Sequence, residues 1–217
     1  MADKIQNAYH DSKNIYDDVL TQRNFFSKAY IKLFWSGTDD NKIAGKVLSY
    51  IPDDFSGTLL DVPAGTAVFT YKKWAQLLDA QIICLDYSED MIGQAKKRLK
   101  NYAHVSCAQG DVGNLPLGND SCDIVLSMNG FHAFPDKGKA FRETWRVLKP
   151  GGKFIACFYI KGESGVTDWL VKNILSKKGW FTPPFQTGSE LKAVLEQMYK
   201  KIDFHIDRSM VYFECIK

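Results

Sequence analysis

The sequence lacks the cysteine and histidine patterns that mark disulfide-stapled or metal-binding domains. It has five cysteines, an odd number, and no two of them form a Cys-x-x-Cys pair. Four of the five lie inside apolar, strand-like runs, so we expect buried free thiols and a reducing compartment. No cluster of histidine, cysteine and carboxylate residues has metal-ligand spacing, so no metal site is predicted.

The sequence also has little net charge and no long hydrophobic run. The formal net charge is +3, which is too weak to indicate a nucleic-acid partner. The longest purely apolar run is Phe154–Ile160, far shorter than the roughly 20 residues of a membrane span. Residues 1–13 are polar and mixed in charge, so we expect no signal peptide and a cytoplasmic protein.

The length and composition of the chain are typical of one globular domain. It has 217 residues, of which 45% are hydrophobic and 24% charged. Over residues 57–160, short apolar runs alternate with segments of helical spacing. Strands are predicted at 58–62, 81–86, 104–108, 123–128 and 153–160, and helices at 67–79, 88–100 and 136–147. This alternation predicts an α/β fold with a parallel sheet covered on both faces.

The flanking segments follow other patterns. Residues 1–56 are expected to be mostly helical, with helices near 23–34 and 39–50. Residues 161–189 break the alternation, and a helix capped by Ser189 is predicted at about 189–200. Two final strands, at 202–207 and 210–216, predict an antiparallel hairpin beside the parallel strands. The motif Lys149-Pro150-Gly151-Gly152 is expected to end a helix and turn into the fifth strand.

The turn after the first predicted strand is the strongest local signal. A turn with Gly65, at the carboxyl end of a strand and before a helix, presents backbone N–H groups to a ligand. Asp86 ends the second strand, at the spacing where a carboxylate accepts hydrogen bonds from ribose hydroxyls. Asp61 precedes the turn, and Asp111 follows the third strand. Without these additional acids, nicotinamide and flavin enzymes would fit the pattern equally well.

In this order, the motifs resemble those of the class I S-adenosylmethionine-dependent methyltransferases, in particular the small-molecule branch related to ubiquinone and menaquinone biosynthesis. The matching strings are LLDVPAGTA, ICLDYSEDMI, AQGDVGNLPL, CDIVLSMNGFHAF and RVLKPGGKF. The resemblance implies a Rossmann-like, doubly wound, mostly parallel seven-stranded sheet with an antiparallel C-terminal hairpin. It also implies S-adenosylmethionine as the cofactor.

The resemblance implies a role for each matching position of the cofactor site. Asp61 and the turn would lie against the methionine and ribose portions, Asp86 would bind the ribose hydroxyls, and Asp111 would accept from the adenine amino group. Further cofactor-binding positions are Tyr16, Pro63, Ala64, Gly65, Thr66, Tyr87, Met91, Val112 and Asn129. The family's glycine-x-glycine-x-glycine is here Pro63-Ala64-Gly65-Thr66-Ala67, a departure that leaves room for weakened cofactor binding.

Two residues are candidates on the acceptor side. His132 follows the fourth strand and is a candidate general base, although a histidine that only shapes the pocket fits as well. Tyr159, near the end of the fifth strand, is a candidate substrate-pocket residue. The Asn/Asp-Pro-Pro-Tyr/Phe motif of base-methylating enzymes is missing after strand four. We therefore expect no nucleic-acid substrate, and the short apolar runs predict no membrane span. A small, partly apolar acceptor is predicted from the aromatic residues of the segments expected to form a lid, which are Phe25, Phe26, Trp35, Trp169, Trp180 and Phe181.

The predicted organisation is one domain over residues 1–217. It comprises a helical lid (1–56), the cofactor core (57–160), a substrate-side insertion (161–189), and the closing helix and hairpin (190–217). The predicted activity is transfer of a methyl group to a small molecule by in-line displacement. The alternatives are a cofactor-binding protein without turnover and an NAD(P)-dependent oxidoreductase.

Overall fold

The computed structural model describes residues 40–217, and the predicted helix near 23–34 therefore lies outside the described residues. One seven-stranded sheet has the order β3-β2-β1-β4-β5-β7-β6. Its strands are β1 (Thr58–Asp61), β2 (Gln81–Asp86), β3 (Val105–Gln109), β4 (Cys122–Met128), β5 (Leu148–Tyr159), β6 (Lys201–Asp207) and β7 (Met210–Ile216). Strands β1 to β5 are parallel, and β7 runs antiparallel to both β5 and β6. The predicted doubly wound sheet with an antiparallel hairpin is confirmed.

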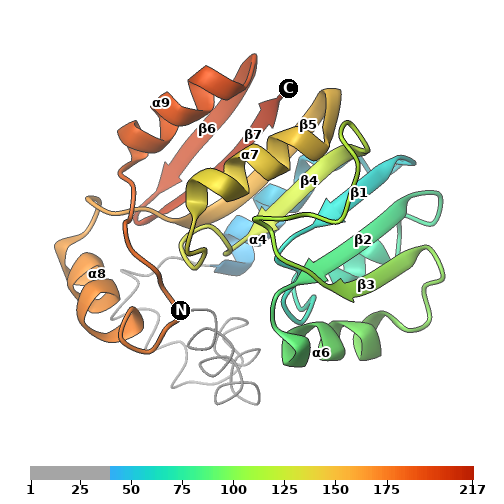
Figure 1. Ribbon diagram of the computed structural model, residues 1–217, viewed down its shortest axis with the longest axis horizontal. Helices are drawn as coiled ribbons and strands as arrows, with labels where there is room; N and C mark the ends of the chain where they lie inside the picture. The colour runs from blue at the N-terminus through green and yellow to red at the C-terminus, as the bar shows by residue number, and fades with distance from the viewer. Residues whose placement is uncertain (1–39) are drawn as a thin grey trace.

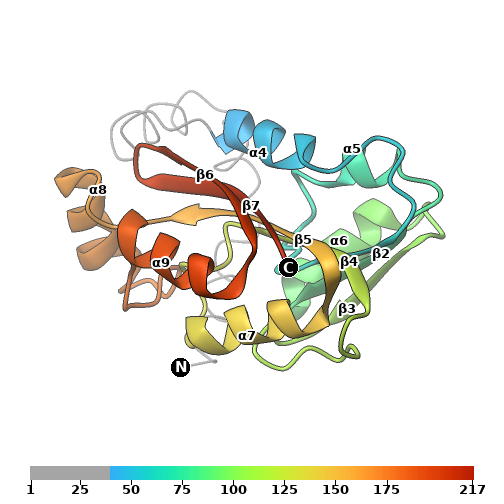
Figure 2. The same ribbon diagram turned by 90° about the horizontal axis from the view of Figure 1, so that it is seen from above.

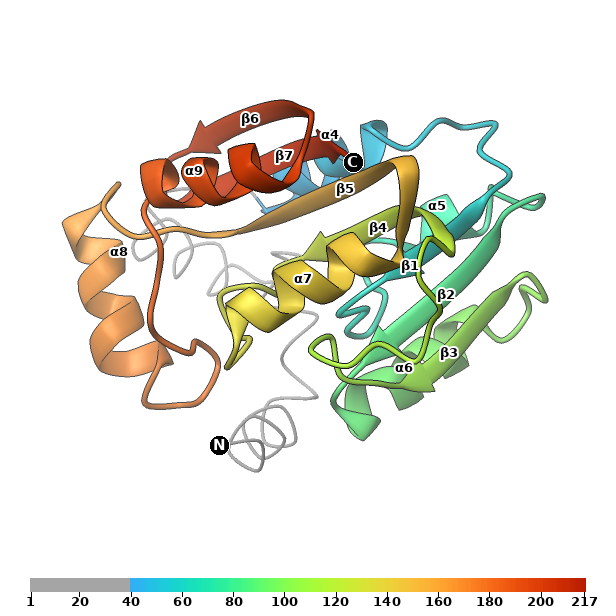
Figure 3. The ribbon, with the colours of Figure 1, turned by 45° about the horizontal axis from the view of Figure 1, so that its top comes forward.

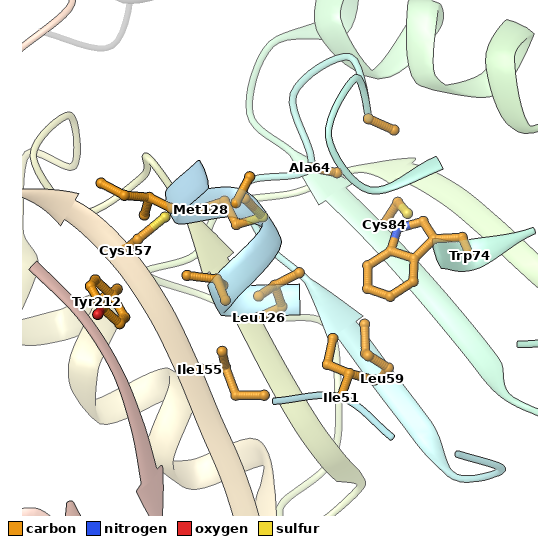
Figure 4. Close-up of a cluster of buried hydrophobic side chains, with 14 of the residues drawn as sticks. Ile51, Leu59, Ala64, Trp74, Cys84, Leu126, Met128, Ile155, Cys157 and Tyr212 are labelled. Atoms are coloured by element: carbon orange, nitrogen blue, oxygen red, sulfur yellow. The ribbon is translucent and has the colours of Figure 1, made fainter. Parts of the chain in front are cut away.

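Helices cover both faces of the sheet (Figure 2). On one face lie α4 (Asp40–Ser49), α5 (Tyr71–Trp74) and α6 (Glu89–Leu99), and on the other lie α7 (Lys137–Val147) and α9 (Gly188–Met198). The strands are apolar on both sides because each side faces a helical layer: along β4, Leu126 packs in the first layer and Val125 in the second. Figure 4 shows the first of these two cores, with Trp74 between the sheet and the first helical layer.

Helix caps explain where α6 and α7 begin. Ser88 accepts a hydrogen bond from the Met91 N–H, as the sequence predicted for α6, and Asp136 accepts from the Lys139 N–H at the start of α7. The predicted cap of α9 was wrong. Thr187, two residues earlier than Ser189, accepts from the Glu190 N–H, and the Glu190 side chain accepts from the Thr187 N–H in return. This capping box satisfies two backbone donors, which Ser189 alone could not do.

Two further predictions need correction. The helix expected at 67–79 is a single turn, α5, because the chain first passes through turns in which Ala67 has a φ of +58°. That left-handed backbone conformation cannot continue a right-handed helix. The segment Lys149-Pro150-Gly151-Gly152 lies within β5 instead of only preceding it. The Gly151 N–H donates to the Lys217 carbonyl, and the Lys217 N–H donates to the Gly152 carbonyl. Both glycines therefore take part in the hydrogen bonding of the sheet.

The segment after β5 forms a structure that periodicity did not predict. It contains α8 (Gly165–Leu170), which continues directly into one π-helical turn, η1 (Val171–Leu175). These elements lie at one end of the molecule, beyond the edge of the helical layers (Figures 1 and 3). No helix within residues 40–217 is both long and apolar enough to cross a membrane.

Candidate cofactor and acceptor pocket

One pocket opens at the carboxyl ends of the parallel strands. From β1 the chain continues to β2 and β3 on one side of the sheet, and then crosses to β4 and β5 on the other side. Ligands bind at such a topological switch point, beyond the carboxyl ends of the strands. The lining comes from the loops that follow β1, β2, β3 and β4. Its predicted cofactor residues are Asp61, Pro63, Ala64, Gly65, Thr66, Asp86, Tyr87, Met91, Asp111, Val112 and Asn129. Tyr16 lies outside the described residues.

The turn after β1 supplies an open cradle of backbone. Gly65 has a φ of +55°, and a Cβ built on it would meet no atom within 4 Å. A side chain there would therefore project into free space and would strain the backbone. Ala67 adopts the left-handed conformation that the family's third glycine would allow, with a φ of +58°. The alanine at this position therefore keeps the glycine-like path of the turn.

Pro63, the other departure from the glycine pattern, is accommodated by a second glycine. A Cβ built on Gly130, just after β4, would lie 2.3 Å from the Pro63 Cδ and 2.8 Å from the Phe134 Cζ. The proline ring thus occupies the space that a side chain at 130 would need. The Val62–Pro63 peptide bond is cis. The contact between Pro63 and Gly130 shows how the turn tolerates proline. It removes part of the reason for expecting weakened cofactor binding.

Asp86 is the acid that fixes the turn. Its Oδ2 accepts a hydrogen bond of 2.8 Å from the Gly65 N–H, and its Oδ1 accepts one of 2.8 Å from the Ser88 N–H. Burial raises the pKa of the carboxyl to about 6, while these two hydrogen bonds oppose the rise. A carboxylate has about four acceptor positions, so two remain for a ligand in the pocket.

Asp61 lies deeper, at the end of β1, and is almost fully buried. The indole Nε1–H of Trp74, on α5, donates to its Oδ2 over 3.1 Å. Burial raises the pKa of Asp61 to about 7, and this hydrogen bond partly opposes the rise. A cationic group bound beside this carboxyl would stabilise its charged form.

The remaining predicted residues line other parts of the pocket wall. Met91 is buried on α6, whereas the Tyr87 side chain is 38% exposed. The exposed Asp111 accepts a 2.7 Å hydrogen bond from the Gly113 N–H and lies beside Val112. Asn129 has a φ of +53°, a conformation that asparagine tolerates better than most residues, and its N–H donates to the Cys157 carbonyl.

His132 and Tyr159 lie behind the pocket wall instead of lining it. The His132 ring stacks on Phe181, with 4.0 Å between centroids, and its Nδ1 accepts from the Tyr159 N–H. Burial lowers the pKa of His132 to about 3, so the ring is neutral. The Tyr159 hydroxyl donates to Asp168 over 2.7 Å. Neither side chain lines the pocket within residues 40–217, and the roles of His132 as a base and of Tyr159 as a substrate contact stay predictions.

Sequence reasoning missed a group of residues that also line the pocket. They are Val68, Phe69, Thr70, Ser88, Gly110, Met128, Ala133, Phe134 and Pro135. Most are apolar and lie in turns, where periodicity carries no signal. The segment Phe134-Pro135 shortly after β4 was a usable cue, because loops at the carboxyl ends of strands converge on one site. Within residues 40–217, no group of three histidine, cysteine or carboxylate side chains is placed to hold a metal ion.

Comparison with known proteins agrees with this geometry. Residues 60–156 match a family model described as a methyltransferase domain. This match, the methyltransferase relatives and the shared fold of solved structures support the resemblance to the class I S-adenosylmethionine-dependent methyltransferases that the sequence shows. The family match and the antiparallel hairpin favour this class over the oxidoreductase alternative.

Individual relatives match parts of the chain. An uncharacterised chloroplastic methyltransferase of Arabidopsis thaliana is 30% identical over 134 residues, 59% of this chain and 38% of the relative. A demethylmenaquinone methyltransferase of Staphylococcus carnosus is 37% identical over 94 residues, 43% of this chain and 39% of the relative. The matches thus span well under half of either relative.

Solved structures share the fold at low identity. A Thermotoga maritima SAM-dependent methyltransferase has a TM-score of 0.69 and 19% identity, with 98% of this chain and 99% of that one covered. A Haemonchus contortus phosphoethanolamine N-methyltransferase, in complex with S-adenosyl-L-methionine, has a TM-score of 0.69 and 15% identity. The match covers 81% of this chain and 52% of that structure.

Proposed function

We propose that the protein transfers the methyl group of S-adenosylmethionine to a small-molecule acceptor. The observation that carries the proposal is the pocket itself. It gathers acids from the ends of β1, β2 and β3 around a glycine turn at the switch point of the sheet. The match of residues 60–156 to a methyltransferase-domain model, and a solved structure of the same fold in complex with S-adenosyl-L-methionine, support the proposal.

The residues fit the cofactor in two respects. Asp86 lines the pocket with acceptor positions left over, as binding of paired ribose hydroxyls requires. Gly65 leaves open space where any side chain would intrude, so backbone can approach the ligand closely. We assign Asp61 to the cationic methionine end, and Met91, Asp111 and Val112 to the adenine.

The chemistry follows from positioning. When bound, the cofactor supplies a methyl group on a sulfonium, which is already activated toward nucleophiles. The pocket's part is to hold the acceptor in line with that methyl group and to exclude water, and alignment of this kind is worth roughly 7–11 kcal/mol at its best. The account uses no side-chain base, since His132 is neutral and lies behind the wall.

The acceptor side of the pocket indicates a partly apolar substrate. Phe69, Met128, Ala133, Phe134 and Pro135 line the pocket alongside the acidic residues. Apolar walls with few polar groups favour flat or aliphatic small molecules. A quinone-ring carbon, a phenol or carboxyl oxygen and an amine nitrogen are all compatible acceptor atoms.

A labelled-methyl assay tests the proposal. The protein is incubated with methyl-labelled S-adenosylmethionine and a panel of quinols, phenols, carboxylic acids and amines, and both labelled product and S-adenosylhomocysteine are measured. We expect turnover with one acceptor class, its loss in Asp86→Ala, and its retention in Asp79→Ala, which removes an exposed acid elsewhere. Cofactor binding without turnover on any class would instead support a binding protein.

A further inference from the structure

An exposed surface on α8 and the segment after it has no role in the pocket. We call it the Trp169 surface and define it by its residues Val166, Trp169, Lys172, Lys177 and Lys178. The side chains of Val166 and Trp169 are 62% and 59% exposed. A spacing of three residues places them on the same face of the helix, where they form an outward apolar patch.

The helix that carries this patch is firmly anchored. Its opposite face buries Thr167, Leu170, Val171 and Leu175 against the core, so each of these side chains is at most 2% exposed. Asp168 fixes the start of the helix by accepting from the Tyr159 hydroxyl at 2.7 Å and from the Gly162 N–H at 2.9 Å. Trp169 therefore lies on a helix whose other face is packed against the core, and 59% of it is exposed.

The segment that follows Trp169 carries charge of one sign. From Trp169 to Ser189 the chain contains Lys172, Lys177 and Lys178 and no acidic residue. All three lysines are exposed, and no carboxylate of the described residues forms an ion pair with them. One exposed acid, Glu163, precedes α8. Within residues 40–217 the Lys178 ammonium contacts only a ring, with its Nζ 5.2 Å from the Trp180 ring centroid, and none of the three lysines forms an ion pair. An apolar patch followed in the chain by such lysines complements a surface that is apolar inside and anionic outside.

The surface connects directly to the pocket wall. The Thr182 N–H, a few residues after Lys178, donates to the His132 carbonyl over 2.9 Å. The Lys137 ammonium donates to the carbonyls of both Thr182 and Phe134, at 2.6 and 3.1 Å. Phe134 lines the pocket, so these hydrogen bonds link the segment that follows the Trp169 surface to the pocket wall.

We propose that the Trp169 surface docks the protein onto an anionic lipid bilayer. Trp169 and Val166 enter the interfacial region, where tryptophan is favoured, and the three lysines bind anionic headgroups. Stable attachment to a bilayer takes two signals, and this surface supplies both an apolar and a basic one. The proposal does not depend on methyl transfer, because lipid binding needs neither cofactor nor acceptor.

Sedimentation with vesicles tests the docking. The full chain is mixed with vesicles of phosphatidylcholine alone or of phosphatidylcholine with phosphatidylglycerol. We expect binding only to the anionic vesicles, and its loss at high salt. Trp169→Ser should weaken binding at least about tenfold. Replacing the three lysines by glutamine should weaken vesicle binding about a hundredfold, because each lysine near an anionic surface raises the affinity roughly fivefold.

The matched control is Leu78→Ser, which removes a side chain that is 68% exposed on the surface near α5. It should leave vesicle binding unchanged, and circular dichroism should show every variant folded. The proposal is overturned if the wild type ignores anionic vesicles, if it binds neutral vesicles equally well, or if Leu78→Ser weakens binding as much as Trp169→Ser. It is also overturned if sedimentation velocity shows a dimer that Trp169→Ser abolishes, because the surface would then bind a second copy.

Discussion

The packing of Pro63 against Gly130 makes a prediction about stability. In Gly130→Ala the new Cβ would lie 2.3 Å from the Pro63 Cδ. That is about 1.2 Å inside the ordinary carbon–carbon contact of roughly 3.5 Å. Overpacking of a buried site typically costs about 1–3 kcal/mol, and a ring close to the backbone yields little, so we expect about 2–3 kcal/mol. The melting temperature should fall by roughly 5–10 °C.

Urea unfolding, followed by tryptophan fluorescence, measures this cost. Gly45→Ala and Gly93→Ala are matched controls, because a Cβ at either helical position meets nothing within 4 Å. Both controls should gain about 0.5–1 kcal/mol of stability. A double-mutant cycle with Pro63→Ala, which removes the clashing ring atoms, should give a coupling of about 1–2 kcal/mol. A cost below about 0.5 kcal/mol, or strictly additive effects, would refute this account of the turn.

Three other predictions concern buried groups and caps. Burial raises the pKa of Asp61 to about 7, so the unfolded chain ionises first and the contribution of Asp61 to the free energy of unfolding should fall as the pH rises from about 4 to 7. The free energy of unfolding of the wild type relative to Asp61→Asn should therefore fall by up to about 4 kcal/mol across this range, whereas equal slopes in both proteins would contradict it. Trp74→Phe leaves the buried Asp61 oxygen without its indole donor and should cost about 1–3 kcal/mol, whereas no cost in urea unfolding would deny that hydrogen bond. Thr187→Ala should cost about 1 kcal/mol and Ser189→Ala under about 0.5, and the reverse order would restore Ser189 as the cap of α9.

The parallel core was predictable because its signals are local and repeated. Strand β2 has the predicted bounds, Gln81–Asp86, since a continuous apolar run between turn residues has few other structures available. Helix α6 begins after Ser88 as predicted, because a capping side chain and a helical pattern coincide there. The convergence of Asp61, Asp86 and Asp111 followed from one rule, that parallel strands end at one edge of the sheet.

The errors arose where tertiary contacts decide the backbone. Helical spacing through Val68, Trp74 and Leu78 predicted a long helix, yet Ala67 takes a positive φ as part of the pocket turn. Leu78 is largely exposed although its spacing suggested a buried face. The stacking of Phe181 on the His132 ring could not be predicted either, because the two residues are far apart in the sequence. Sequence spacing does not determine the direction in which a loop side chain points.

The central claim, a cofactor pocket held together by Asp86, is tested most directly by isothermal titration calorimetry with S-adenosylhomocysteine. We expect one binding site in the wild type and unchanged affinity in Asp79→Ala. Asp86→Ala should bind at least about tenfold more weakly, since hydrogen bonds to a charged group are worth roughly 1.5–3 kcal/mol. Absence of binding to the wild type at millimolar ligand, or equal affinity in folded Asp86→Ala, would contradict the account.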